Sequence, residues 1–186
     1  MKSLLRSTTL ATLIAVSSTL ALRAEDSPAG YFDLGKFNPP SGGGQFVEVN
    51  IKSPLLSLAA KLAEKQEPEV ADLLRNIKSI RVNVVGLDDA NRAELTERLV
   101  RIRADLESKG WDRVVTVLEK GQDVGIYLKH RGDTAIEGIV VTVIEKGKEA
   151  VFVNVVGDIS PEKLSVLGDR LGIDPLKHLG KTGKKA

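Results

Sequence analysis

Asp158 is the residue whose type and position most directly suggest chemistry in this sequence. It follows Gly157 at the end of the apolar run "VFVNVV", so its carboxylate would stand where a strand ends. A catalytic aspartate needs a partner, and neither a histidine nor a second acid lies at a diagnostic spacing from it. The same two residues suit a turn and the cap of a following helix, because the helix dipole favours negative charge at its N-terminus. We therefore interpret Gly157 and Asp158 as architecture.

Histidine and cysteine usage offers no stronger candidate. His130 and His178 are the only histidines, and they do not form a metal-ligand spacing such as H-E-x-x-H. The chain has no cysteine, which excludes thiol chemistry and disulfides. It also has no G-x-S-x-G elbow and no phosphate-binding P-loop. These observations predict no catalytic residue, no metal site and no cofactor.

Two further charged patterns have an ordinary structural interpretation. Residues 131–133 spell Arg-Gly-Asp, an adhesion tripeptide, but Gly-Asp between two apolar runs is typical of a hairpin turn. Glu137, Glu145 and Glu149 lie along or beside one predicted hairpin, where isolated carboxylates are usually solvated. Neither pattern identifies a substrate.

Residues 1–24 have the composition of a secretory signal peptide. Lys2 and Arg6 form a positive start, residues 10–22 carry no charge, and Ala24 offers a small residue for cleavage. The apolar core is shorter than the about 20 residues of a membrane span. We expect an exported protein, periplasmic or extracellular after cleavage, with no transmembrane segment.

The charge balance argues against a nucleic-acid-binding protein. The whole chain has 27 basic and 25 acidic residues, and the predicted signal peptide supplies Lys2, Arg6 and Arg23 of the basic ones. The remainder is nearly neutral, whereas nucleic-acid binders usually carry a clustered basic footprint. We expect a protein partner in the cell envelope or a second copy of the chain, and no nucleic acid.

Glycine, proline and lysine content divides the rest of the chain. Residues 25–45 include "NPPSGGGQ", which blocks regular structure and predicts a flexible arm or linker. The preceding "YFDLGKF" holds three aromatic residues, so we expect it to clamp the arm onto the domain surface. Residues 46–173 form the predicted domain, and residues 174–186 form a basic, disordered tail.

The first half of the domain alternates between strand and helix periods. "FVEVNI" and "SIRVNVVGL" predict strands, and Pro68 divides the segment between them into two short helices or one kinked helix. The first helical stripe is Leu55, Leu58, Ala59 and Leu62. Asp88 or Asp89 caps a longer helix that ends at Gly110. Its stripe is Leu95, Leu99, Ile102 and Leu106.

The second half reads as four strands in hairpin order, "WDRVVTVLE", "DVGIYLKH", "AIEGIVVTVIE" and "AVFVNVVGD". Each connection carries a glycine, as tight hairpins prefer. A last helix is predicted after Ser160, with the stripe Leu164, Leu167 and Leu171. The pattern predicts a single α+β domain, a mainly antiparallel sheet with helices packed on one face.

We expect the helices to cover one sheet face and to leave the other open, since an antiparallel sheet can keep one face in water. The covered face would bear Val82, Ile126, Val141 and Val153. The open face would bear Arg81, Asn83, Tyr127, Lys129, Val140, Thr142, Phe152 and Asn154.

Solvation accounts for the charged members of this open face but not for Val140 and Phe152, and large exposed apolar patches tend to mark contacts. The leading hypothesis is therefore a non-enzymatic envelope protein that binds a protein, or a second copy of itself, by burying these two residues. It predicts that Phe152→Asp abolishes the contact and leaves the fold intact.

A second hypothesis is a small-ligand-binding or hydrolytic domain with its site between the arm and the sheet. Tyr31, Phe32 and Trp111 would line the pocket, and Asp158 or Glu137 would supply the acid. This hypothesis predicts a concave site at that place.

The order of these segments resembles a known family. "YFDLGKF", "FVEVNI", "SIRVNVVGL", the Trp111 strand and "VFVNVVGDISPEKLSVLGDRL" together are similar to domain-of-unknown-function family 4252, over roughly Gly30 to Leu171. The resemblance implies an exported bacterial protein with no established activity or catalytic residues. Many members look like lipoproteins, and this chain, which has no cysteine, departs from them there.

Overall fold

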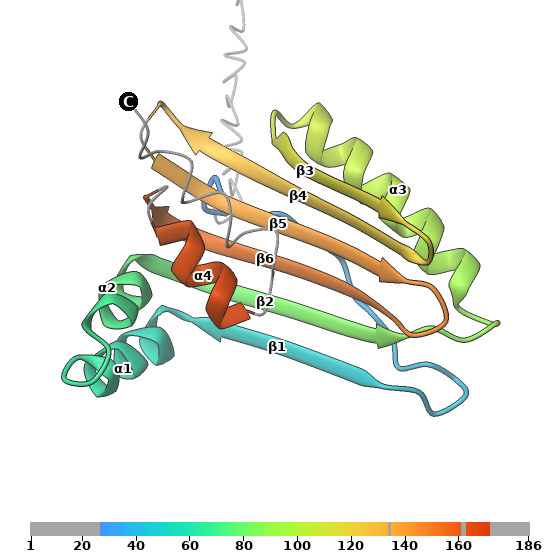
Figure 1. Cartoon of the computed structure of the whole chain (residues 1–186), viewed down its shortest axis with the longest axis horizontal. Coiled ribbons are helices and arrows are strands. Elements are labelled where there is room, and N and C mark those ends of the chain that lie inside the picture. The colour runs from blue at the N-terminus through green and yellow to red at the C-terminus, as the bar shows by residue number, and fades with distance from the viewer. Residues whose placement is uncertain (1–26, 134, 161–162, 172–186) are drawn as a thin grey trace, which may run out of the picture.

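The computed structural model describes residues 27–133, 135–160 and 163–171. The predicted signal peptide and the predicted basic tail therefore lie outside the described residues. Six strands form one antiparallel sheet in the order β1-β2-β6-β5-β4-β3 (Figure 1). The strands are β1 (Phe46–Lys52), β2 (Ile77–Gly86), β3 (Asp112–Glu119), β4 (Gln122–Arg131), β5 (Ala135–Glu145) and β6 (Glu149–Ile159). The helices are α1 (Ser53–Ala63), α2 (Pro68–Asn76), α3 (Arg92–Ser108) and α4 (Leu164–Leu171).

The strands β3 to β6 form the predicted meander of hairpins. Gly121, Gly132 and Gly147 take positive φ angles of 89°, 60° and 79° in the three connections, a conformation that glycine adopts without steric cost. β6 then pairs with β2, and β2 pairs with β1, which completes the sheet. The prediction of a single α+β domain with a mainly antiparallel sheet is confirmed.

One sheet face, here called the front face, bears Ile126, Val141 and Val153 and is covered by α1, α2 and α4 (Figure 1). These helices contribute Leu56, Leu73 and Leu164 to a core of aliphatic residues from the strands. The front face was predicted correctly as a helix-covered face. Pro68 separates α1 from α2, so the predicted choice between two helices and one kinked helix is resolved as two helices.

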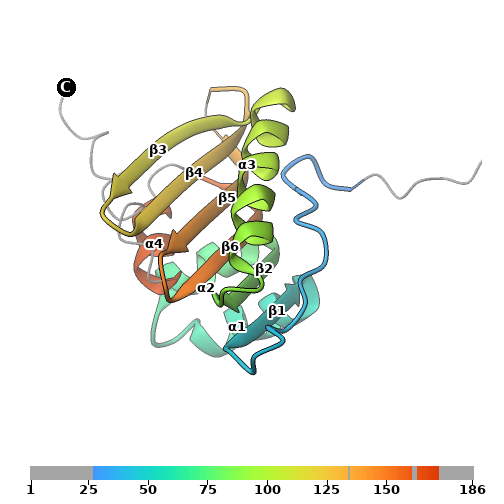
Figure 2. The ribbon, with the colours of Figure 1, turned by 90° about the vertical axis from the view of Figure 1, so that its right-hand side faces the viewer.

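The opposite face, here called the back face, is covered by α3 and by the arm, residues 27–45 (Figure 2). The four predicted stripe residues of α3 are all buried there, together with Phe32, Leu34 and Phe37 of the arm. The prediction that helices pack on one face only is therefore wrong. The cause is the strand order: α3 connects β2 to β3 at the far edge of the sheet, so it crosses the sheet on the face that the other helices leave free.

The back face is consequently not an open surface. Tyr127, Val140 and Phe152 are each 0% exposed, and the polar Asn83, Thr142 and Asn154 are at most 2% exposed. The prediction that these residues, with Arg81 and Lys129, form an open interaction face is wrong in its premise. Burial of large apolar side chains on both faces is what stabilises the sheet.

Among the described residues, no helix combines the length and the apolar character that a membrane crossing requires.

Candidate functional site: a basic groove between the arm and the sheet

The residues of the predicted face bind parts of the same chain. Lys129 Nζ donates to the carbonyl oxygens of Lys109 and Gly110, 2.8 and 3.1 Å away, and so closes the C-terminal end of α3. Thr142 Oγ1 accepts hydrogen bonds from the guanidinium of Arg103, which comes from α3. Three other members of the face, Arg81, Phe152 and Asn154, contact the arm.

Asn154 fixes the arm to the centre of the sheet. Its Oδ1 accepts a hydrogen bond from the backbone N–H of Phe32 at 3.1 Å. Its Nδ2 donates to the carbonyl oxygens of Gly30 and Ile139, both at 3.1 Å. A buried side chain with all these groups paired specifies one position of the arm, because any displacement leaves polar groups unsatisfied.

Gly30 allows the arm backbone to approach the sheet. A Cβ atom at this position would lie 1.6 Å from the carbonyl oxygen of Glu137 in β5. Gly138 faces it, and a Cβ atom there would meet Trp111 and the Gly30 carbonyl oxygen at 2.5 Å. Two glycines back to back therefore permit a contact between main chains that no side chain would allow.

Aromatic and cationic contacts hold the rest of the arm. The Phe37 ring packs on Phe152 with 4.8 Å between centroids, and the Arg98 guanidinium of α3 lies 3.8 Å from the Phe37 centroid. Arg98 also donates to the carbonyl oxygens of Lys36 and Leu34, each at 2.6 Å. Burial lowers the pKa of the Arg98 guanidinium, which nevertheless stays charged at neutral pH because guanidinium groups are so basic.

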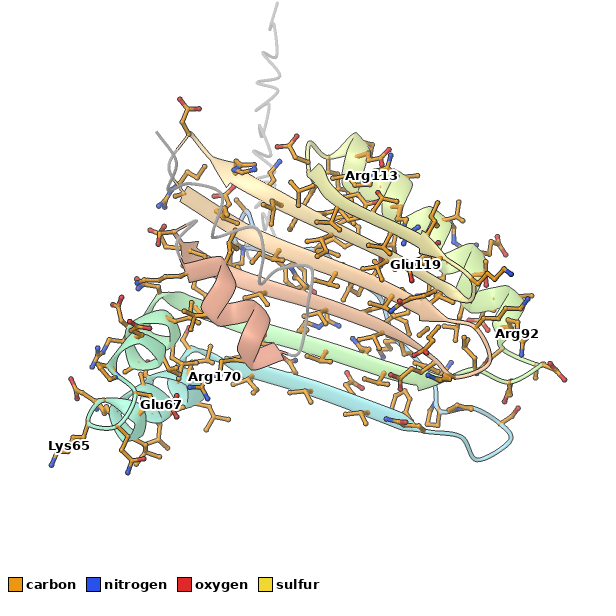
Figure 3. The ribbon with its side chains drawn as sticks, viewed as in Figure 1. Lys65, Glu67, Arg92, Arg113, Glu119 and Arg170 are labelled. Atoms are coloured by element: carbon orange, nitrogen blue, oxygen red, sulfur yellow. The ribbon has the colours of Figure 1, made fainter. Side chains whose placement is uncertain are left out.

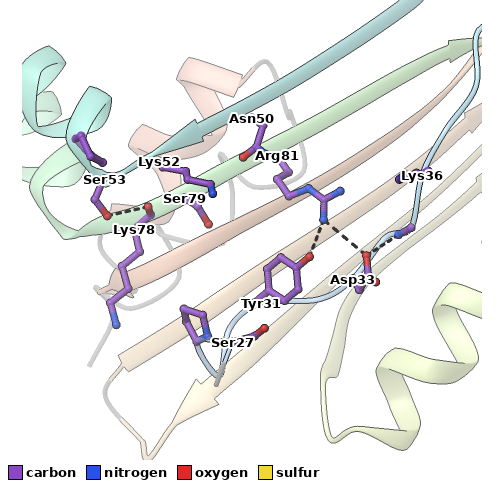
Figure 4. Close-up of a pocket in the computed structure, with 13 residues that line it drawn as sticks. Ser27, Tyr31, Asp33, Lys36, Asn50, Lys52, Ser53, Lys78, Ser79 and Arg81 are labelled. Atoms are coloured by element: carbon purple, nitrogen blue, oxygen red, sulfur yellow. Dashed lines mark hydrogen bonds and ion pairs between the residues drawn. The ribbon is translucent and has the colours of Figure 1, made fainter. Parts of the chain in front are cut away.

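This docking creates a groove of about 1260 Å³ between the arm and the β1–β2 end of the back face (Figure 4). The register of the two strands brings Asn50 opposite Arg81 and Lys52 opposite Ser79, so all four line one wall. The arm forms the facing wall. The remaining lining residues are Ser27, Pro28, Tyr31, Asp33, Gly35, Lys36, Ser53, Pro54 and Lys78.

The groove is basic. Four cationic side chains line it, Lys36, Lys52, Lys78 and Arg81, against the single carboxylate of Asp33. Cations gathered on both walls of a concave site focus a positive potential that attracts anions.

Arg81 is the fixed cation of this site. Its NH1 donates to Tyr31 Oη at 3.0 Å and lies 3.8 Å from Asp33 Oδ1, and its side chain is only 17% exposed. Asp33 is itself positioned by the backbone N–H of Gly35, which donates to its Oδ1 at 2.9 Å. The guanidinium is therefore held in one orientation before any ligand arrives, as Figure 4 shows.

The start of α1 adds to the positive potential. Ser53 and Pro54 both line the groove, and α1 begins without a side-chain cap. The backbone N–H groups of a first helical turn have no partners within the helix, and the dipole places partial positive charge there. This helix end therefore reinforces the attraction of the lysines and Arg81 for a negatively charged group.

The second hypothesis is partly supported in its location and wrong in most of its residues. A concave site does lie between the arm and the sheet, and Tyr31 does line it. Phe32 and Trp111 are instead buried against each other, 6.1 Å apart and nearly perpendicular. Glu137 lies in β5 and does not line the groove.

Asp158 has the surroundings of a structural residue, not those of a catalytic acid. The strand does not end at Gly157, because β6 continues to Ile159, so the prediction of a turn there is wrong. A Cβ atom on Gly157 would lie 2.5 Å from the Asn76 carbonyl oxygen, which explains the glycine as a close approach. Asp158 forms an exposed ion pair with Arg131 at 2.7 Å.

The other candidates remain structural. His130 Nε2 lies 3.7 Å from Asp112 at the outer strands. Arg131 is the last residue of β4, and Gly132 and Asp133 follow it in the β4–β5 connection. His178 lies outside the described residues. Within the described part of the chain, no group of three or more His, Asp or Glu residues is arranged to hold a metal ion.

Sequence reasoning missed Asn50 and the lysines of the groove. Strand alternation alone places Asn50 and Lys52 on one face of β1. Their neighbourhood with Arg81 depends on the β1–β2 register, and their neighbourhood with Lys36 depends on where the arm docks. Neither is visible as a motif.

Comparison with known proteins finds a family match. The model of a family described as Domain of unknown function (DUF4252) matches residues 41–167, which includes every strand of the sheet. No curated protein and no solved structure matches the chain.

Proposed function

We propose that this chain, which belongs to the DUF4252 family, is an exported, non-enzymatic binding protein whose groove holds an anionic molecule. The ligand carries more than one phosphate, sulfate or carboxylate group. The observation that carries the proposal is the set of four cations around one carboxylate in a groove that the arm and the sheet build together.

The size of the groove supports a ligand larger than a single ion. Its volume of about 1260 Å³ exceeds the about 300–1,000 Å³ of common small-molecule pockets. Its walls carry hydroxyl and amide groups beside the cations, from Tyr31, Asn50 and Ser79. Such groups orient a ligand, while the cations supply attraction over a longer range.

The lining residues support binding more than catalysis. They include no histidine and no cysteine, and the only carboxylate, Asp33, lies beside Arg81. A carboxylate in that position balances a cation and orients it. The leading sequence hypothesis was an envelope protein that binds a protein or a second copy of itself. The proposal keeps the non-enzymatic envelope protein and changes both the surface and the ligand.

The test is calorimetric titration of the purified protein with tripolyphosphate and, separately, with a hexaglutamate peptide. We expect binding of at least one probe, and weaker binding as salt concentration rises, because salt screens exposed charges. The phosphate and carboxylate probes distinguish the two kinds of anionic group. Binding that is indifferent to salt would contradict the proposal.

Two charge-matched double variants localise the binding. Lys36→Gln with Lys78→Gln removes two exposed lysines that line the groove. Lys120→Gln with Lys146→Gln removes two exposed lysines in hairpin connections outside it. Both variants lose the same charge, so a site in the groove predicts roughly tenfold weaker binding only in the first. An equal loss of affinity in both variants would mean that binding depends only on net charge, and it would refute a site in the groove.

Export is part of the proposal and has its own test. The supporting observation is the signal-peptide pattern of residues 1–24. Expression of the full chain in a bacterial host followed by mass spectrometry of the envelope fraction should find an N-terminus at Glu25. Recovery of the intact chain in the cytoplasmic fraction alone would refute export.

A further inference from the structure

Helix α1 exposes a leucine stripe that no other part of the described chain covers. Leu55, Leu58 and Leu62 are 55%, 53% and 75% exposed. At about 100° per residue they fall within roughly 60° of one another on the helix surface. The buried residues of α1, Leu56 and Ala60, lie on the opposite side, at 3% and 1% exposure.

The sequence pattern predicted one helical stripe of Leu55, Leu58, Ala59 and Leu62, and in the structure its three leucines lie on the exposed side of α1. The segment has apolar residues on two sides, and the sheet needs only one of them. Other exposed apolar side chains are spread over β1, α3 and β3, as Val47, Val100, Val114 and Leu118. The stripe is therefore a concentrated apolar surface on a rigid helix, and such surfaces tend to mark contacts.

Lysines flank the stripe. Lys61 follows Leu58 by three residues, the spacing of neighbours on a helix surface, and Lys65 lies in the turn just beyond Ala63, the last residue of α1. Figure 3 shows Lys65 projecting from the outer corner of the molecule, away from the sheet.

Two nearby acids are engaged elsewhere. Glu64 pairs with Arg75 at 2.6 Å, and Glu67 pairs with Arg170. Among the described residues, neither Lys61 nor Lys65 forms an ion pair. The stripe is thus bordered by positive charge that the fold does not neutralise.

The size and charge of this surface argue against a second copy as the occupant. Leu55 to Leu62 spans only roughly 10 Å of helix. The stripe is therefore small beside a stable protein interface, which buries about 800 Å² on each partner. Two copies joined through the stripe would also gather their flanking lysines around one contact, where like charges repel. A lipid surface has neither limitation, because leucines enter the headgroup boundary while lysines approach anionic phosphates.

We propose that α1 docks the protein onto an anionic lipid surface, with Leu55, Leu58 and Leu62 at the headgroup boundary and Lys61 and Lys65 beside lipid phosphates. This inference goes beyond anion binding in the groove and does not depend on it. It assigns a role to the leucine stripe of α1, which no other part of the described chain covers.

The test is co-sedimentation of the purified protein with vesicles of phosphatidylcholine alone and of phosphatidylcholine mixed with phosphatidylglycerol. The test variant is Leu58→Ser with Leu62→Ser. The matched control is Val100→Ser with Leu118→Ser, which removes two apolar side chains exposed by 61% and 73% elsewhere. Far-ultraviolet circular dichroism checks that both variants stay folded.

We expect the protein to bind the phosphatidylglycerol vesicles in preference to the neutral ones. The stripe variant should bind roughly tenfold or more weakly, since the apolar contribution scales with the leucine area removed from water. The control variant should bind as the unmodified protein does. Tripolyphosphate titration of the stripe variant keeps the two sites separate, because failure of membrane docking leaves binding in the groove unchanged.

Absence of vesicle binding by the unmodified protein would overturn the inference. So would equal losses in the stripe and control variants. Light scattering tests the excluded occupant: a dimer that becomes a monomer in the stripe variant would assign the stripe to a second copy.

Discussion

Substitution of Phe37 by alanine tests whether the arm is an integral part of the fold. Phe37 is only 7% exposed and lies between the Phe152 ring and the Arg98 guanidinium. Its removal should loosen the arm, and with it the outer wall of the groove. An arm that is a mere linker would not respond in this way.

The expected cost follows from the contacts of the ring. Burial of a phenylalanine side chain contributes about 1.5–3 kcal/mol, the aromatic pair with Phe152 about 0.5–1.5 kcal/mol, and the stacked Arg98 about 0.5–1 kcal/mol. Core Phe→Ala substitutions cost about 3–5 kcal/mol. Because the arm can detach instead of leaving a cavity, its own docking free energy limits the loss. We expect the free energy of unfolding to fall by about 2–4 kcal/mol.

Trp111 provides the assay. It is the only tryptophan, it is 5% exposed, and it contacts Phe32 of the arm edge to face. Denaturant unfolding followed by its fluorescence gives the loss of stability, and its emission in water reports release of the arm. Phe37→Leu keeps most of the apolar volume but loses the aromatic and cation contacts of the ring. It should therefore cost about 1–2.5 kcal/mol, less than the alanine variant. Equal stability of the alanine variant and the unmodified protein, with unchanged Trp111 emission, would refute the docked arm.

Three further substitutions probe other parts of the structure. Gly30→Ala places a Cβ atom against the Glu137 carbonyl oxygen, so hydrogen exchange of the arm should rise while that of α2 stays constant; an unaffected arm would contradict the close approach. Phe152→Asp buries an unpaired carboxylate at a position with 0% exposure, so circular dichroism should show an unfolded chain; a folded variant would restore the hypothesis of an open face. Lys163 holds the pKa of Asp72 below its usual range through a hydrogen bond and its charge. The pair therefore stabilises the fold at pH values above the ordinary carboxylate pKa, and this stabilisation is lost as the pH falls through the lowered pKa. Denaturant unfolding of Asp72→Asn at several acidic pH values should show a weaker pH dependence, and an unchanged acid profile would count against the pair.

Local features of the fold were predictable from the sequence because they depend on neighbouring residues. Alternation of apolar and polar residues over the last four strands and a glycine in each connection predict the hairpins. The apolar residues at helical spacing from Leu95 to Leu106 predict α3. Apolar side chains on both sides of the strands, Val140 and Phe152 among them, also carried a signal that both faces are covered. That signal was interpreted as an open binding face.

The cover of each face was not predictable because it depends on strand order. The sequence does not state that β6 pairs with β2, and only that pairing sends α3 across the back face. In α1 the run "LLSLAAKLA" has apolar residues on two sides of the helix. Leu56 and Ala60 form the buried side, which faces the sheet. Periodicity alone cannot distinguish the two sides.

The groove was predictable in place but not in composition. Aromatic residues in the arm indicated that it docks, and the site beside it follows from that. Lys36, Asn50, Lys78 and Arg81 come from separate segments and meet only through register and docking. Charged residues in strands and arms are ordinarily solvated, so nothing local distinguished these from the rest.

Titration of the isotope-labelled protein with tripolyphosphate, followed by amide chemical shifts, tests the central claim most directly. The account predicts that the largest shifts occur at Tyr31, Asn50, Ser79 and Arg81, on both walls of one groove, and saturate together. Shifts spread over exposed lysines throughout the chain, or confined to residues outside the groove, would contradict it.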